Sequence, residues 1–88
     1  MPNIKQQKKR VRTAARERLE NLRYRSSVKT YTRRLHDAAE NGDGERVTAE
    51  HDRLVKLLDR AVSRGALHRN TAARKKAAAA RFVRETSS

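Results

Sequence analysis

Positively charged side chains recur along one side of the N-terminal third of the chain. Drawn as an α-helix at 100° per residue, this segment places its main cations within about 60° of one another. They are Lys5, Lys9, Arg12, Arg16 and Arg23, and the same line continues through Ser27, Thr30 and Arg34. Cations neutralise phosphates, and small hydroxyls between them can donate hydrogen bonds to phosphate oxygens. The spacing therefore predicts a surface that binds a phosphate backbone.

Further cations, among them Arg10, Arg18 and Arg25, make this segment basic on nearly every side. A helix face that is merely solvated usually pairs its cations with acids four residues away. Residues 1–36 contain only Glu17 and Glu20 as acids, so contact with an anionic partner is favoured. The candidate contacts of this segment are Asn3, Lys5, Lys8, Lys9, Arg10, Arg12, Arg16, Arg23, Ser27, Lys29, Thr30 and Arg34.

A second basic cluster lies between His68 and Lys76. It places cations and a polar amide at the expected start of a helix, where free backbone N–H groups and the helix dipole favour an anion such as phosphate. Asn70 can cap that helix while its neighbours bind, and we expect His68 to make a loop hydrogen bond rather than to bind a metal. The candidate contacts here are His68, Arg69, Asn70, Arg74, Lys75, Lys76 and Arg81.

The net charge of +13 is unevenly distributed over the 88 residues. It is +10 over residues 1–36, −3 over residues 37–63 and +6 over residues 64–88. Solubility alone does not require such a layout. The pattern predicts that the two outer segments meet the anionic partner while the middle segment faces away from it.

The sequence offers no support for catalysis, for a cofactor or for a membrane span. The absence of cysteine excludes disulfides, thiolate metal sites and cysteine nucleophiles, and the three histidines lack the spacing of a metal pair. There is no Gly-rich phosphate loop and no paired-histidine zinc motif. The longest apolar run, Ala77 to Ala80, is far too short to cross a bilayer. We expect a soluble intracellular chain that is not an enzyme and has no metal, no cofactor, no small-molecule substrate and no membrane partner.

Glycines divide the chain into three helical segments. Asn41-Gly42 and Gly65 are typical of helix C-termini, because glycine adopts a positive φ without a Cβ clash, and Asp43 can cap the next helix. Between these points good helix formers prevail, and strand-like alternation is absent. We predict an all-α fold with helices over about residues 4–40, 44–64 and 70–85, and a disordered tail over residues 86–88.

Each predicted helix carries one apolar face. The faces are Tyr24, Val28, Tyr31, Leu35 and Ala38; then Val47, Leu54, Leu58 and Ala61; then Ala72, Ala78, Ala79, Phe82 and Val83. Short connections make successive helices antiparallel, which predicts one domain over residues 1–88, an up-down-up three-helix bundle. Leu, Ile, Val and Phe make up only 15 of the 88 residues, as in many disordered chains. The periodicity nevertheless favours a fold from about residue 20 onward.

The first twenty residues carry a second apolar stripe, formed by Ile4, Val11, Ala15, Leu19 and Leu22. It lies on the side of the helix opposite the Tyr24–Leu35 stripe. One straight helix cannot direct both stripes into the same core. We therefore predict a long, projecting first helix, in which residues 1–20 form a basic extension that its partner orders.

Several stretches resemble a known family. Asn3-Ile4-Lys5, Lys8-Lys9-Arg10 and Ser27-Val28-Lys29-Thr30 resemble the long first helix of the bacterial small-subunit ribosomal protein S-twenty family. Asn41-Gly42-Asp43 is similar to the family's Ala-Gly-Asp turn. The run from Gly65 to Lys76 resembles the family's G-x-[IL]-H-[KR]-N-K-A-A-R-K-K signature, which is the most specific of these matches.

The resemblance implies a three-helix bundle that binds 16S ribosomal RNA within the 30S subunit, as a monomer in the cytoplasmic ribosome. It implies that basic helices pack between RNA helices, bridge the 5′ domain and the penultimate stem, and aid assembly. Because the aromatic residues Tyr24, Tyr31 and Phe82 lie on packed faces, we expect readout through phosphate and shape rather than base stacking.

Two other functions fit part of the pattern. A nucleoid-type DNA-binding protein would share the charge, but it would need a recognition helix or an apolar wedge for the groove. A membrane-active amphipathic helix would need a wide, bulky apolar face. The choice of RNA over DNA comes from the resemblance and not from the charge.

Overall fold

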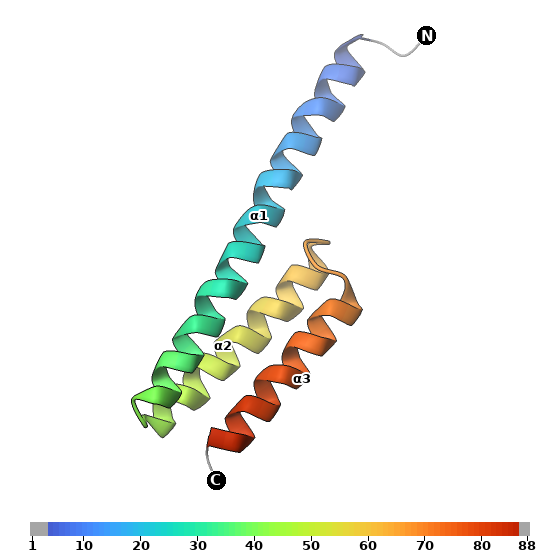
Figure 1. The fold of residues 1–88 in the computed structure, drawn as a ribbon. Coiled ribbons are helices and arrows are strands. Elements are labelled where there is room, and N and C mark those ends of the chain that lie inside the picture. The colour runs from blue at the N-terminus through green and yellow to red at the C-terminus, as the bar shows by residue number, and fades with distance from the viewer. Residues whose placement is uncertain (1–3, 87–88) are drawn as a thin grey trace.

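Three antiparallel helices form the fold of the computed structural model, which describes the backbone of residues 4–86 and the side chains of residues 7–86. The helices are α1 (Ile4–Glu40), α2 (Gly44–Ser63) and α3 (Arg69–Thr86), and α2 lies between the other two (Figure 1). Every regular element within residues 4–86 is helical, as predicted, and the ends of the helices fall within one residue of the predicted ends. The molecule is elongated, measuring 64 × 21 × 13 Å.

Two glycines end the first two helices. Gly42 has φ 69° and Gly65 has φ 75°, a region that other residues rarely adopt. After α1, the N–H groups of Gly42 and Asp43 donate to the carbonyls of Ala39 and Ala38. The same two-bond motif follows α2, where Gly65 donates to Val62 over 3.0 Å and Ala66 donates to Ala61 over 2.8 Å. These turns reverse the chain tightly enough to make neighbouring helices antiparallel.

The start of α2 agrees with the sequence prediction, whereas the start of α3 does not. Asp43 caps α2, because its Oδ1 accepts from the N–H of Arg46 over 3.1 Å. Asn70 is not a cap, since α3 already begins at Arg69. The cap is His68, whose ring Nδ1 accepts from the N–H of Asn70 over 3.1 Å. The expected loop hydrogen bond of His68 is thus confirmed, and the amide of Asn70 is free of capping.

The C-terminal end of α3 also differs from the prediction. Thr86, assigned above to a disordered tail, is the last residue of the helix. Its hydroxyl donates to the carbonyls of Phe82 over 3.0 Å and of Val83 over 3.1 Å, which prolongs the ordered end. The rest of that tail, residues 87–88, lies outside the described residues.

The core runs along the three predicted apolar faces. Its buried members are Val28, Leu35 and Ala38 of α1, Val47, Leu54, Leu58 and Ala61 of α2, Ala66 of the turn, and Ala72 and Ala79 of α3. Leu35 and Leu58 are the largest fully buried side chains, at 1% and 0% exposed. Ala78 was assigned to the core wrongly. It is exposed, because it lies about 100° round the helix from Ala79.

One charged residue lies within this core and was not foreseen. Glu50 is only 4% exposed, between Val47 and Leu54 on the inner face of α2. One of its oxygens, Oε1, accepts from Arg53 over 3.1 Å. The other, Oε2, has no hydrogen-bond partner among the described residues, and the same holds for Nε2 of His51.

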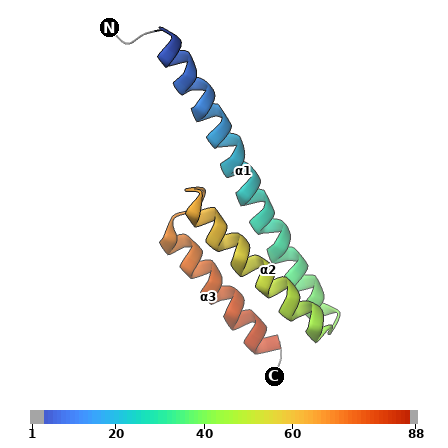
Figure 2. The same ribbon diagram turned by 180° about the vertical axis from the view of Figure 1, so that it is seen from behind.

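The bundle is held together mainly through α2. It packs along both α1 and α3, whereas α1 and α3 meet only sparingly. Between these two helices the His36 ring stacks on Phe82, with ring centroids 4.0 Å apart. Figure 2 shows the same order from behind, with α2 and α3 beside the C-terminal half of α1 only. The N-terminal half of α1 extends alone beyond the bundle, as predicted.

The second apolar stripe lies on this lone segment and is uncovered. Val11, Leu19 and Leu22 are 69%, 59% and 54% exposed, and Ala15 between them is exposed as well. We call these four residues the outer stripe. The side chain of Ile4, predicted to belong to it, lies outside the described side chains.

Candidate nucleic-acid interface

The cations of α1 whose side chains are described are exposed, and they form no ion pairs. The predicted contacts that are exposed here are Lys8, Lys9, Arg10, Arg12, Arg16, Arg23, Lys29 and Arg34. In the described part of the chain, none of them makes an ion pair with a carboxylate. Arg34 instead lies over the ring of Tyr31, with its guanidinium carbon 5.2 Å from the ring centroid. Asn3 lies outside the described residues, and the side chain of Lys5 is not described.

The hydroxyls along this line are less free than the spacing suggests. The hydroxyl of Thr30 already donates to the carbonyl of Ser26 over 3.1 Å, and Ser27 is half-buried. A phosphate would have to compete with that internal hydrogen bond for the proton of Thr30. Phosphate binding on α1 therefore depends chiefly on the cations.

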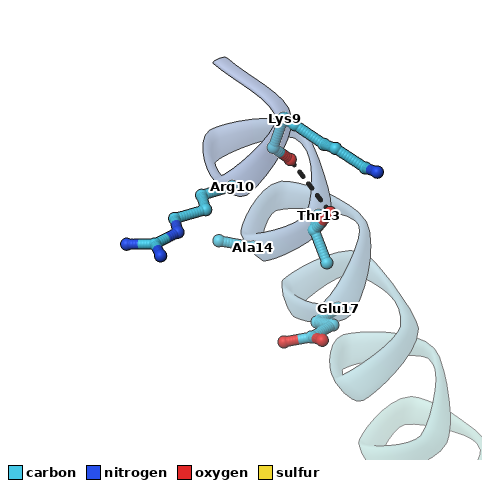
Figure 3. A pocket seen from close by; sticks show the side chains of 5 residues that line it. All are labelled: Lys9, Arg10, Thr13, Ala14 and Glu17. Atoms are coloured by element: carbon cyan, nitrogen blue, oxygen red, sulfur yellow. Dashed lines mark hydrogen bonds between the residues drawn. The ribbon is translucent and has the colours of Figure 1, made fainter. Parts of the chain in front are cut away.

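Surface depressions line the projecting part of α1 between Gln7 and Arg25, and those described there are open to solvent. The depression in Figure 3 is lined by Lys9, Arg10, Thr13, Ala14 and Glu17, all from successive turns of α1. The side chains of Lys9 and Arg10 point to opposite sides, and the hydroxyl of Thr13 donates to the carbonyl of Lys9 over 2.9 Å. Since no second element closes this space, it is not a small-molecule pocket.

The second cluster occupies the first two turns of α3. Arg69, Asn70, Arg74 and Lys75 are exposed there. Lys76 differs from them, because its Nζ pairs with the Oδ1 of Asp59 on α2 and its side chain is about two-thirds buried. This ion pair bridges α3 and α2, so Lys76 is less free than its neighbours to meet a partner.

The outward face of α3 has a feature that the sequence analysis missed. Arg74 and Arg81 lie on it two turns apart, and the exposed residues between them include Ala77 and Ala78. Methyl side chains leave room for a phosphate backbone to come close to the helix while the two arginines reach past them. In the sequence, alanines placed between two cations at helical spacing would have indicated this face of α3.

The two clusters lie toward the same end of the bundle. The α2–α3 turn and the first turn of α3 lie beside the middle of α1, at the end from which its N-terminal half projects (Figure 1). Asp59, the acid of α2 nearest this end, is already paired with Lys76. The geometry thus brings together two basic surfaces that are about fifty residues apart in sequence.

Metal and membrane sites are not found. Within residues 4–86 there is no group of three His, Asp or Glu residues that could hold a metal ion. Over the same range, no helix is both long and apolar enough to cross a bilayer.

Comparison with known proteins identifies the family. The family model described as Ribosomal protein S20 matches residues 2–84 of the chain. The chain belongs to this family. Relatives named "Small ribosomal subunit protein bS20" include one from Salinispora tropica, 45% identical over 94% of both chains. Another, from Mycobacterium ulcerans, is 46% identical over 94% of this chain and 95% of the relative. A third, from Kocuria rhizophila, is 43% identical over 94% and 96%.

Membership in the S20 family confirms the resemblance drawn from the sequence. It makes the chain a structural ribosomal protein and not an enzyme. The family match runs through both basic clusters and the turns between the helices. Which individual side chains touch a partner stays a prediction for every candidate residue named above.

Proposed function

We propose that this chain, a structural component of the bacterial small ribosomal subunit in the cytoplasm, binds 16S ribosomal RNA directly. It does so as a monomer, through phosphate and shape contacts, and it aids assembly of the subunit. The observation that carries the proposal is the set of exposed, unpaired cations on the projecting half of α1. A folded domain has no structural use for this many uncompensated charges, and a polyanion neutralises them by releasing its counterions.

Shape recognition is supported by the position of the aromatic rings. Tyr24 and Tyr31 are half-buried on the packed face of α1, and Phe82 is half-buried and stacked on His36. Sequence-tolerant stacking on bases needs exposed rings, and the Tyr and Phe rings within residues 7–86 all belong to the bundle. Phosphates and ribose hydroxyls are then the groups that the exposed arginines and lysines meet.

The extension over residues 1–20 has a role of its own in this proposal. A lone helix with mostly like charges is marginal in water, because packing supplies most of the stability of protein helices. Phosphates that neutralise Lys9, Arg12 and Arg16 relieve this repulsion. RNA binding and ordering of the extension are therefore coupled.

Competition binding tests the proposal against the DNA-binding alternative. The full chain is bound to a labelled 16S ribosomal RNA transcript at fixed salt, and unlabelled 16S transcript or duplex DNA is added in equal phosphate concentration. We expect the RNA to displace the label at least about tenfold more effectively than the DNA, since specific complexes exceed nonspecific ones by more than this. Equal displacement by the two would favour a general DNA-binding protein instead.

A further inference from the structure

The outer stripe has no partner in the fold. Among residues 7–86, Val11, Leu19 and Leu22 are the large apolar side chains that are exposed. With Ala15 they cover an arc of about 80° over three turns of α1. This arc points away from α2 and α3, about 170° round the helix from the packed face. Burying it is not needed for the fold, so its apolar character points to an external partner.

The charges around the stripe have a definite arrangement. Arg12, Arg16 and Arg23 flank it on one side, and Arg18 and Arg25 flank it on the other; all five are exposed. Glu17 and Glu20, the only acids of this segment, lie on the opposite face of the helix. The stripe is thus an apolar row between two rows of cations, over a length of about 17 Å from Val11 to Leu22.

The arrangement of charges around the outer stripe distinguishes between three possible partners: a second copy of the chain, a bilayer surface and an RNA duplex. A second copy of the chain would bring two sets of arginines together, which opposes self-association. A bilayer surface needs a wide apolar face with bulky aromatic anchors, and the row is one side chain wide. The minor groove of an RNA duplex is wide and shallow, is lined by ribose, and has a phosphate strand on each side. Its pattern of negative, uncharged and negative surfaces complements the helix.

We propose that the outer stripe lies against ribose in the shallow minor groove of a 16S RNA duplex. Arg12, Arg16 and Arg23 then reach the phosphates of one strand, and Arg18 and Arg25 reach those of the other. The inference rests on the proposed function and adds the groove and the face of α1 that enters it. It also explains why the acids of this segment lie on the far side of the helix.

The test replaces the two leucines by a polar residue with nearly the same helix propensity, in Leu19→Gln/Leu22→Gln. Thr13→Gln, on the opposite face of the same turns, is the matched control. Binding of the full chain to protein-free 16S RNA is measured at several salt concentrations. We expect the double variant to bind roughly tenfold more weakly at every salt concentration, because it loses apolar contacts. The salt slope should not change, since no counterion release is lost. Thr13→Gln should behave like the original chain.

Hydroxyl-radical cleavage of the RNA supplies the second readout, because it reports the exposure of ribose carbons that line the minor groove. The double variant should lose protection over a short run of nucleotides in one duplex. Leu19→Ala/Leu22→Ala, which favours the helix, should lose the same protections and so excludes a failure of α1 to form.

Three results for the double variant would overturn the inference. The first is unchanged affinity and unchanged protection of the RNA, and the second is a loss of affinity accompanied by a flatter salt slope. The third is normal binding to free RNA with poorer incorporation into 30S particles. The last would assign the stripe to a protein neighbour. Failure of the original chain to bind 16S RNA would instead refute the proposed function itself, so the two failures are distinguishable.

Discussion

The two halves of α1 share one continuous helical backbone but differ in what surrounds their side chains. From Tyr24 to Ala38 the helix buries one face against α2, and Leu35 is almost completely enclosed. From Lys8 to Leu22 the backbone has the same geometry, yet even the large apolar residues are more than half exposed. The C-terminal half packs against a partner within the chain. The N-terminal half has the side chains of a contact surface but no partner within the described fold.

This difference separates folding from function along a single helix. Packing supplies most of the stability of helices in proteins, whereas like charges on a lone helix oppose its formation. The C-terminal half of α1 can therefore be stable in the free protein. In the proposed function, phosphates supply the missing stability of the N-terminal half, which couples its order to the RNA.

Hydrogen exchange should reveal the largest contrast between the two halves. In the free chain, amides of residues 7–20 should exchange at nearly the unfolded rate, while those of Val28–Ala38 and of α2 are protected at least about a hundredfold. Adding 16S RNA should slow exchange in residues 7–20 by more than in α2. Equal protection along the whole of α1 without RNA would contradict the division.

Leu58→Ala should have the largest effect on stability. Leu58 is 0% exposed at the centre of the α2 face, so its truncation should lower the free energy of unfolding by about 2–4 kcal/mol. Leu19→Ala removes the same atoms from the projecting half and should change that free energy by less than about 0.5 kcal/mol. Urea unfolding followed by circular dichroism compares the two variants. Similar losses would mean that the outer stripe contributes to the fold.

Salt dependence sharpens the comparison on the functional side. Each cation that meets a phosphate contributes about 0.7–0.9 to the slope of log affinity against log salt. Arg12→Gln/Arg16→Gln should therefore flatten the slope by about 1–2 units, and Arg74→Gln/Lys75→Gln should do likewise.

The matched control for these pairs is Lys56→Gln/Arg60→Gln, two exposed cations of α2. Arg53 is unsuitable because it pairs with the buried Glu50. Binding to one 16S fragment is measured for all three pairs, and the control should change the slope clearly less than the other two. Three indistinguishable slopes would show that only net charge matters.

The fold was largely predictable because its signals are local. Gly42, Asp43 and Gly65 define helix ends through their own backbone preferences, and the 3.6-residue period identifies which faces are buried. The cap of α3 was assigned to Asn70 instead of His68 because both side chains can accept a capping hydrogen bond. Only the three-dimensional course of the chain decides between two candidates that lie two residues apart.

The candidate site was predictable in part, for a related reason. The lack of ion pairs among the described α1 cations follows from the scarcity of acids beside them. The pairing of Lys76 with Asp59 depends on how α3 packs against α2, and the sequence contains no local sign of this long-range contact. Glu50 was missed because a carboxylate interrupts the apolar pattern, although its position fits the buried face between Val47 and Leu54.

Glu50 gives the last and smallest predicted effect. Its charge is buried in the packed bundle, whereas the charges of the projecting half are exposed. The exposed charges on α1 are accessible to a partner, whereas the unpaired Oε2 of Glu50 is buried where no described group bonds to it. Burying a carboxylate with one oxygen unsatisfied is unfavourable, and an apolar residue of similar volume is often neutral or stabilising. Glu50→Met should therefore raise the free energy of unfolding by up to about 1 kcal/mol. Arg53→Met should lower it, because Glu50 would lose its one partner. Thermal unfolding of both variants and of the double variant measures the coupling, and a clear loss of stability in Glu50→Met would show that the carboxylate is satisfied. The RNA-binding slope should be the same in Glu50→Met as in the original chain, since this charge lies in the packed half and not on the contact surface.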